Sequence, residues 1–171
     1  MSRHPEFDTS QPYAVLTGDV VKSRKLPDAL RTNLGDRLRE ALTHVRAILP
    51  DEVPYEISVF RGDGWQFLVR SPEIALRAAV AFRAGLMRQS VPHQTKGRAL
   101  IDSRVAIGSG SGGTVVSTAI SESEGPAFEQ SGLVLEGMNK SKRFLGIQLP
   151  DSPEMELCIA LMDRLISRWT G

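Results

Sequence analysis

Cysteine is almost absent from this sequence of 171 residues, since Cys158 is the only one. A single cysteine excludes an intramolecular disulfide and a cysteine-rich zinc site, and it fits a reducing compartment. The first twelve residues, MSRHPEFDTSQP, are polar and contain two prolines, so they lack the apolar core of a signal peptide. No apolar run approaches the roughly 20 residues that a membrane helix needs. We therefore expect a soluble, cytoplasmic protein with no membrane partner.

An excess of positive charge is also missing, because 21 basic residues face 20 acidic ones and the formal net charge is +1. Without a basic footprint, direct nucleic acid binding by this segment is not expected. Internal repeats and low-complexity stretches are absent as well. The length and an apolar fraction of 41% suffice for one domain with a hydrophobic core.

The most informative stretch that is present is Arg61-Gly62-Asp63-Gly64-Trp65, between the strand-like runs Tyr55–Phe60 and Trp65–Val69. Gly62 and Gly64 tolerate positive φ, which favours a tight hairpin with Asp63 at its turn. An earlier strand-like run, Tyr13–Thr17, leads directly into Gly18-Asp19. If these strands are neighbours, both carboxylates meet at one end of a sheet.

Hydrophobic periodicity predicts the other elements. An amphipathic helix from Asp28 to Leu49 follows the first strand, and a second helix begins at Ser71-Pro72 and packs closely through its alanines. After a polar loop at 89–99, the expected elements are a strand at Leu100–Ile107, a glycine-rich hairpin loop at Gly108–Gly113, an antiparallel partner strand at Thr114–Ile120, a helix over about 125–139, a strand at Arg143–Gln148 and a last helix from Asp151.

The predicted order is thus β-α-β-β-α-β-β-α-β-α. Its first six elements match the ferredoxin-like α+β arrangement, in which the first and third strands lie side by side. The fold class we expect is α+β, a mostly antiparallel sheet with helices packed on it, extended by a β-hairpin and further helices. As domains we expect a loose arm at 1–12, the α+β domain at 13–150 and a C-terminal helix at 151–171.

Asp19 and Asp63 are the candidate metal ligands. Two converging carboxylates beside flexible backbone suit a divalent cation, most often Mg²⁺ carrying nucleotide phosphates. The alternative is that each aspartate is an ordinary turn residue, since Gly-Asp is common in turns.

The segment after Asp19 is the candidate phosphate site, comprising Val20, Val21, Lys22, Ser23 and Arg24. Backbone N–H groups at a strand-to-helix turn can cradle phosphate, with the polar side chains adding donors. A solvated basic loop is the alternative. Trp65 is a candidate for stacking on a base, although a half-buried sheet tryptophan is commoner.

The same residues resemble the class III nucleotidyl cyclases and the related GGDEF enzymes. In that palm-like domain one aspartate follows the first strand, a second lies in a Gly-Asp hairpin, and the pair binds two metals. Gly18–Val21 and Arg61–Gly64 stand in those places here. Arg104–Gly108 resembles the next cyclase strand, and Gly125–Phe128 resembles the start of the catalytic helix.

A closer resemblance is to the SatD-like bacterial proteins, on the strength of Thr17–Arg24, Gly62–Gln66 and Glu124–Phe128. Members of that group often end in a helix-turn-helix, and Leu161–Thr170 resembles the connecting helix that precedes it. A DNA-binding segment could therefore follow in the native protein.

The chain departs from active cyclases at the catalytic helix. Those enzymes place an asparagine four residues, and an arginine eight residues, after the opening glycine, where Glu129 and Leu133 stand here. Asn139 and Arg143 lie too far along the sequence to be simple substitutes. Catalysis is thus less expected than binding.

Two functional hypotheses follow. The first is a nucleoside triphosphate-binding, Mg²⁺- or Mn²⁺-dependent domain that could be a degenerate cyclase or sensor. In it Trp65 and Phe128 are candidate contacts for base or ribose. Glu129 is a catalytic candidate, and the alternative for this residue is a surface salt bridge. The second is a regulatory or dimerisation domain of a SatD-like regulator that binds no ligand. The cyclase resemblance implies a homodimer in either case.

Overall fold

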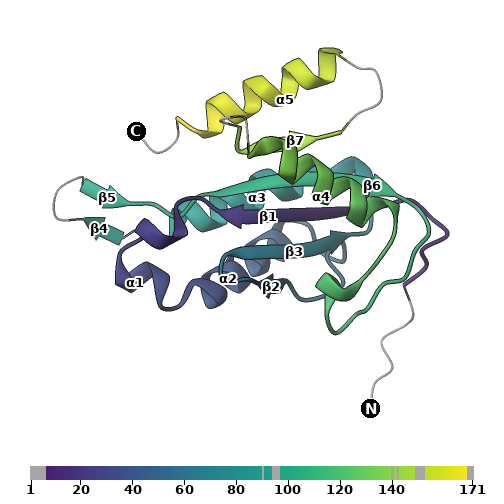
Figure 1. The fold of residues 1–171 in the computed structure, drawn as a ribbon, viewed down its shortest axis with the longest axis horizontal. Coiled ribbons are helices and arrows are strands. Elements are labelled where there is room, and N and C mark those ends of the chain that lie inside the picture. Colours follow the sequence, from purple (N-terminus) through teal and green to yellow (C-terminus); the bar gives the residue numbers. More distant parts are fainter. Residues whose placement is uncertain are drawn as a thin grey trace.

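The computed structural model describes residues 7–89, 91–93, 97–139, 141, 143–148 and 153–168. Its main sheet has the strand order β2-β3-β1-β6-β7 (Figure 1). The strands are β1 (Tyr13–Val20), β2 (Ser58–Phe60), β3 (Gly64–Val69), β4 (Val91–His93), β5 (Gly97–Ala99), β6 (Ser103–Gly110) and β7 (Leu145–Ile147), of which β4 and β5 form a separate hairpin. The helices are α1 (Asp28–Arg31), α2 (Leu34–Ile48), α3 (Ala75–Arg88), α4 (Pro126–Met138) and α5 (Pro153–Ile166), with short 3-10 turns at Ser23–Lys25, Pro72–Ile74 and Ile120–Glu122.

The sheet confirms the ferredoxin-like prediction. Strand β1 pairs antiparallel with both β3 and β6, and β2 pairs antiparallel with β3. The last strand, β7, adds to the edge in parallel with β6. Because β1 is central, its carboxyl end lies between the β2–β3 hairpin and the start of β6.

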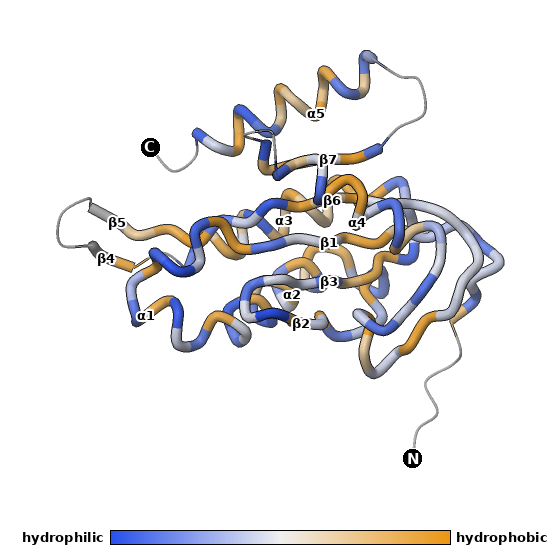
Figure 2. Tube along the Cα trace, viewed as in Figure 1, coloured by the Kyte–Doolittle hydropathy of each residue, from blue (hydrophilic) through white to orange (hydrophobic). Residues whose placement is uncertain are grey.

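The helices form a layer on each face of the sheet (Figure 1). Helices α2 and α3 pack together on one face, over alternate β1 residues such as Ala14 and Leu16. Helix α4 covers the other face, where Phe128 packs near Tyr13 and Val15. In Figure 2 the tube is coloured as hydrophobic along much of β1, α3 and α4. The alternation of the β1 side chains thus serves two cores.

Helix α3, whose alanines predict close packing on a sheet, contacts β1 and β6 and also packs closely against α2. A Cβ atom added to Gly85 would meet Ala41 at 3.3 Å, so these two positions bring the helix backbones together. The side chains of Ala78, Ala79 and Phe82 are fully buried on the same helix. Small residues at the contact let the two helix backbones approach each other closely.

Several predicted elements differ from the structure. The helix expected over 28–49 is interrupted at Thr32 and Asn33, so α1 and α2 are separate helices. The loop expected at 89–99 contains β4 and β5. The strand expected at Leu100–Ile107 is β6, which starts and ends three residues later.

The strand predicted at Thr114–Ile120 is wrong. After β6 the described chain makes only one isolated bridge, between Thr114 and Glu124, and then a 3-10 turn at Ile120–Glu122. Gly112 and Gly113 have φ of 84° and 88°, and a Cβ at Gly113 would clash with the backbone of Glu124. These glycines therefore shape a looped return to α4 rather than a hairpin.

Of the arm expected at 1–12, residues 1–6 lie outside the described residues, and Phe7 packs edge-on against Tyr13. The end of the predicted connecting helix, 169–171, lies outside them too. No helix in the described ranges is long and apolar enough to cross a membrane.

Helix α5 is joined to the body by a buried ionic cluster. The side chain of Arg83 on α3 has no exposed surface, and it donates two hydrogen bonds to Asp102 (3.0 and 2.8 Å) and one to Asp163 on α5 (3.1 Å). Asp163 also accepts the backbone N–H of Phe144 at 3.0 Å, and the Phe144 ring lies 5.2 Å from the Arg83 guanidinium. A charge buried this deeply requires such partners.

Candidate functional site

Asp19 and Asp63 are backbone neighbours at the carboxyl end of β1, as the sequence predicted. Asp19 is opposite Gly64 in the β1–β3 register, and Gly64 directly follows Asp63 in the chain. The N–H of Val20 donates to the carbonyl of Asp63 at 3.0 Å, which ties the hairpin turn to β1. Gly62 has the left-handed φ that the glycine pattern predicts (86°), but the second left-handed residue of the turn is Arg61 (52°) and not Gly64.

The carboxylate of Asp19 is held by Arg104 on the neighbouring strand. These residues are opposite each other in the β1–β6 register, and Arg104 donates from Nε (2.7 Å) and Nη2 (2.5 Å) to the two oxygens. Arg104 also donates to the Oδ1 atom of Asn139 at the end of α4. About a quarter of each side chain of the Asp19–Arg104 pair stays exposed, so solvent and ligands reach this ion pair.

Asp63 has a weaker partner. Its Oδ2 atom accepts a hydrogen bond of 2.5 Å from the hydroxyl of Ser23. Ser23 begins a 3-10 turn after Lys22, whose φ of 53° is left-handed. The turn that follows β1 therefore folds back onto the hairpin, and Lys22 and Arg24 stay exposed beside the carboxylates.

The predicted phosphate cradle is smaller than expected. The N–H groups of Val20 and Val21 are occupied, donating to the carbonyls of Asp63 (3.0 Å) and Asp102 (2.9 Å). The side chain of Val20 is buried in the core. The prediction that these two amides face phosphate is thus corrected. The side-chain donors left in the segment belong to Lys22 and Arg24, because the Ser23 hydroxyl donates to Asp63.

A cleft of about 490 Å³ opens beside the ion pair. The residues that line it come from the turn after β1, from β6 and from the segment that leads into β7, and they are Val21, Lys22, Arg104, Ser141, Arg143 and Phe144. Three of these side chains are cationic and none is acidic. Such a lining suits an anion with several oxygens, such as a phosphate chain.

Trp65 lies under the site rather than in it. Its indole is fully buried, stacks 5.6 Å from Phe67, and donates from Nε1 to the hydroxyl of Ser103 at 2.8 Å. The Ser103 hydroxyl in turn donates to the carbonyl of Asp19 at 2.7 Å. The predicted base contact by Trp65 is therefore wrong for this conformation, because the ring has no accessible face.

Phe128 and Glu129 lie at the other end of the sheet. Phe128 packs 6.0 Å from Tyr13, at the opposite end of β1 from Asp19, and six residues of strand span about 20 Å. Glu129 is exposed in the first turn of α4. The structure thus separates both candidates from the carboxylates, since α4 runs away from Tyr13 and reaches Arg104 only at Asn139.

The donors around Asp19 and Asp63 determine which kind of metal site the two carboxylates could form. Within the described residues, no group of three or more His, Cys, Asp or Glu side chains could enclose a metal ion. Mg²⁺ commonly uses only one or two carboxylates when substrate phosphates complete its shell. Asp19 and Asp63 fit that kind of site, provided that Arg104 releases Asp19.

Sequence reasoning missed the roles of Arg104, Asn139 and Arg143. The signal for Arg104 was its register, since the residue opposite Asp19 depends on where β6 starts, which was placed three residues too early. The sequence separation of Asn139 and Arg143 from Gly125 argues against both residues. The length of α4 brings Asn139 back to Arg104, and the segment after it puts Arg143 in the cleft wall.

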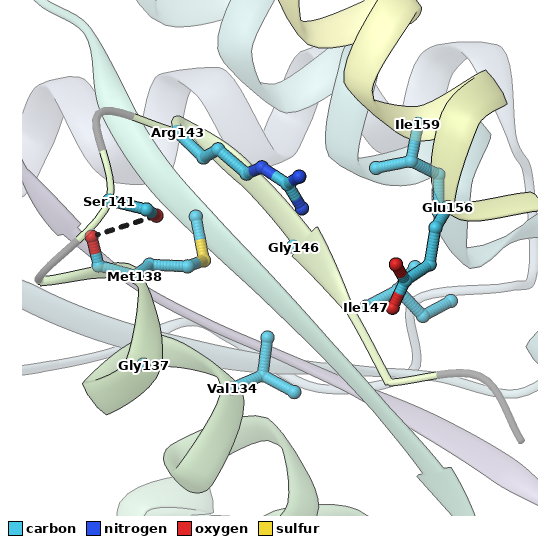
Figure 3. Close-up of a pocket in the computed structure, with 9 residues that line it drawn as sticks. All are labelled: Val134, Gly137, Met138, Ser141, Arg143, Gly146, Ile147, Glu156 and Ile159. Atoms are coloured by element: carbon cyan, nitrogen blue, oxygen red, sulfur yellow. Dashed lines mark hydrogen bonds between the residues drawn. The ribbon is translucent and has the colours of Figure 1, made fainter. Parts of the chain in front are cut away.

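A second cavity, of about 350 Å³, lies between α4, β7 and α5 (Figure 3). It shares Ser141 and Arg143 with the cleft. In Figure 3 the side chains of Arg143 and Glu156 reach over it from different sides, and Val134 and Met138 are on its α4 side. Arg143 therefore borders both hollows.

No protein-family model matches the sequence, and a search of curated proteins finds no significant match. Solved structures do resemble the fold. The GGDEF domain of YfiN (TpbB) from Pseudomonas aeruginosa has a TM-score of 0.55 at 14% identity, covering 82% of this chain and 84% of that one. The active GGEEF domain of a diguanylate cyclase from Vibrio cholerae has a TM-score of 0.57 at 13% identity, covering 82% and 85%.

A bacterial light-regulated adenylyl cyclase is similar too, with a TM-score of 0.53 and 14% identity over 80% of this chain and 42% of the other. At identities this low, the likeness concerns the fold alone. The chain thus has the palm-like α+β fold of GGDEF and nucleotidyl cyclase domains.

Proposed function

We propose that this chain is a nucleoside triphosphate-binding domain that uses a divalent cation. The observation that carries the proposal is the cationic cleft of Lys22, Arg104 and Arg143, which opens beside Asp19 and Asp63. The triphosphate is the matching ligand because it offers oxygens to the cations and can bring a metal to the carboxylates. The cyclase-like fold supports the same ligand class by analogy.

Each side chain has a distinct part in this proposal. Lys22 and Arg143 bind phosphate oxygens, assisted by the N–H groups of the turn after β1. Arg104 exchanges its carboxylate partner for phosphate, which leaves Asp19 free to act with Asp63 as ligands of Mg²⁺ or Mn²⁺. The ion, when bound, would neutralise phosphate charge.

We propose binding in preference to catalysis. Glu129 is remote from the cleft, and Asn139 is occupied by Arg104. No carboxylate or histidine lines the cleft among the described residues. If a reaction does occur, it is attack of a ribose 3′-hydroxyl on the α-phosphate, as in the cyclases that share the fold.

Thermal unfolding tests the proposal, with ATP, GTP, CTP and UTP each added with Mg²⁺, with Mn²⁺ and with EDTA. Cyclic di-GMP belongs in the panel because a neighbouring structure, the GGDEF domain of DgcB from Caulobacter crescentus, is a complex with it. A ligand at a hundred times its Kd stabilises the fold by about 2.7 kcal/mol. We expect a metal-dependent shift with at least one triphosphate that Asp19→Asn and Asp63→Asn abolish.

Asp28→Asn is the matched control. Asp28 pairs with Arg31 at the surface of α1, so its loss should leave the nucleotide shift unchanged. A shift that persists in EDTA and in both site variants would support triphosphate binding and refute the part of the proposal in which Asp19 and Asp63 bind a metal. If none of the nucleotides shifts the midpoint, the proposal fails.

A second candidate function is a regulatory or dimerisation domain, as the SatD-like resemblance implies, in a cytoplasmic homodimer. The exposed leucines of α5 favour it. A dimer that forms identically in Asp63→Asn, with no response to any nucleotide, would support this function over the first. Nucleotide binding that changes self-association would show that the domain has both functions and that they are coupled.

A further inference from the structure

Helix α5 has a second apolar face, which points away from the body. Its buried side consists of Ile159, Asp163 and Ile166. On the other side Leu157, Leu161 and Leu165 are 61%, 53% and 61% exposed. Figures 1 and 2 show α5 as the outermost element beyond β7, with apolar segments along its length. Three leucines four residues apart form a continuous stripe on a helix.

The charges at the ends of this stripe are arranged symmetrically. Leu157 and Leu165 are each four residues from Leu161, while Glu154 and Arg168 are each seven residues from it. At 100° per residue, the four positions within α5, from Glu154 to Leu165, fall within an arc of about 80°, and Arg168 lies in the turn two residues after the helix ends. Along the helix and into the turn after it, the order is therefore one acidic residue, three leucines and one basic residue.

We propose that this stripe binds a second copy of the same helix in antiparallel orientation. In an antiparallel pair centred on Leu161, Leu157 packs against Leu165 of the partner subunit. Glu154 then lies opposite Arg168 of the partner subunit, at both ends of the interface. A parallel pair would instead place Glu154 against its own copy and Arg168 against its own copy, which is unfavourable.

This inference does not depend on nucleotide binding. It assigns the proposed homodimer to a particular face of the protein, so the homodimer and the α5 interface can be tested separately. A strictly monomeric protein would overturn both, whereas a dimer that forms through the sheet would overturn only the α5 interface.

Cross-linking at the two-fold axis tests the geometry. The variant L161C in a Cys158→Ser background places one thiol at the centre of the interface, within reach of its symmetry copy through a short bismaleimide. We expect a covalent dimer on a denaturing gel. The matched control is L133C in the same background, because Leu133 is also an exposed leucine (64%) but lies on α4. Equal cross-linking of both variants would indicate random collision and overturn the proposal.

The native Cys158 distinguishes the two orientations. A parallel pair would bring Cys158 beside Cys158 of the partner subunit, whereas the antiparallel pair separates the two thiols by six residues, or about 9 Å, along the axis. Mild oxidation should therefore leave the native protein unlinked by disulfide. Rapid formation of a Cys158 disulfide dimer would show the parallel arrangement and overturn this one.

Charge exchange gives a second measurement, by sedimentation over a roughly hundredfold concentration range. Arg168→Glu should weaken the dimer by about tenfold, since it places two acidic groups together at each end. Adding Glu154→Arg should restore the native Kd, because the pairs are then only reversed. A double variant as weak as Arg168→Glu alone would contradict the predicted pairing, as would a dimer unaffected by Leu161→Glu.

Discussion

Replacing Arg83 by methionine is the sharpest test of how α5 is attached. Methionine keeps much of the length of the side chain but removes the cation that Asp102 and Asp163 share. Those carboxylates are only 18% and 8% exposed, so two negative charges would face each other with little access to solvent. Removing one partner from a buried ionic group costs about 3–5 kcal/mol.

Three hydrogen bonds from the guanidinium and its contact with the Phe144 ring disappear together, which favours the upper part of that range. For a domain of this size, each kcal/mol lowers the melting temperature by about 2–4 °C. We therefore expect a fall of about 10–15 °C in Arg83→Met, measured by calorimetry. Hydrogen exchange should rise first in α5 and β7, because Asp163 joins α5 both to Arg83 of the body and to the N–H of Phe144 before β7.

The double variant Arg83→Met/Asp163→Asn separates the charge effect from the packing effect. Asparagine keeps an acceptor for Phe144 and removes one of the opposed charges, so it should recover part of the lost stability. Arg39→Met is the matched control, since Arg39 pairs with Asp36 at the surface and should cost under about 1 kcal/mol. Two results would show that the ionic account of α5 is wrong. One is a loss of stability in Arg83→Met no larger than that in Arg39→Met, and the other is a larger loss in Arg83→Met/Asp163→Asn than in Arg83→Met alone.

Three further changes test the site and its supports. Gly18→Ala should destabilise the fold by about 1–3 kcal/mol in urea unfolding, because its Cβ would overlap the Arg104 carbonyl and the Trp65 indole; an unchanged midpoint would refute that packing. Arg104→Lys should weaken nucleotide binding in calorimetric titration, because a single ammonium cannot replace the bidentate contact to Asp19; unchanged affinity would remove Arg104 from the site. Tyr13→Phe should cost about 1 kcal/mol at pH 7 through the lost bond to the Gly112 carbonyl. Burial raises the pKa of Tyr13. The stability that its hydroxyl contributes is therefore fully present below the pKa of the unfolded state, near 10, and is lost as the pH rises through the pKa of the folded state. The difference in unfolding free energy between the native protein and Tyr13→Phe should narrow above about pH 10.

The fold was predictable wherever the hydrophobic pattern was strong. The β1 and β3 strands, the hairpin at Asp63 and helix α4 follow from alternating or periodic apolar residues and from glycine at the turn. The predicted strand at Thr114–Ile120 failed because its β-branched residues are in a return loop fixed by Gly113 and Gly125, whose backbones contact each other. Tertiary contacts outweighed local propensity there.

The site was predictable only in part, for a related reason. Asp19 and Asp63 are each next to a glycine at a strand end, so local sequence marks them. Arg104 has no local mark, because it matters only through its register with Asp19. Trp65 was misjudged because side-chain direction in a strand alternates, and Trp65 points into the core formed with Phe67 and Phe82.

Three consecutive residues connect the anchor of α5 to the candidate site. Asp102 binds Arg83 through its side chain and Val21 through its carbonyl, Ser103 binds the carbonyl of Asp19, and Arg104 holds the Asp19 carboxylate. A ligand that draws Arg104 away from Asp19 acts on the same short segment whose Asp102 shares Arg83 with Asp163. Energetic coupling between two sites is reciprocal, so a nucleotide that tightens the α5 dimer must bind the dimer more tightly by the same factor. Sedimentation with and without nucleotide measures that factor, and a value of one would show that the two surfaces act independently.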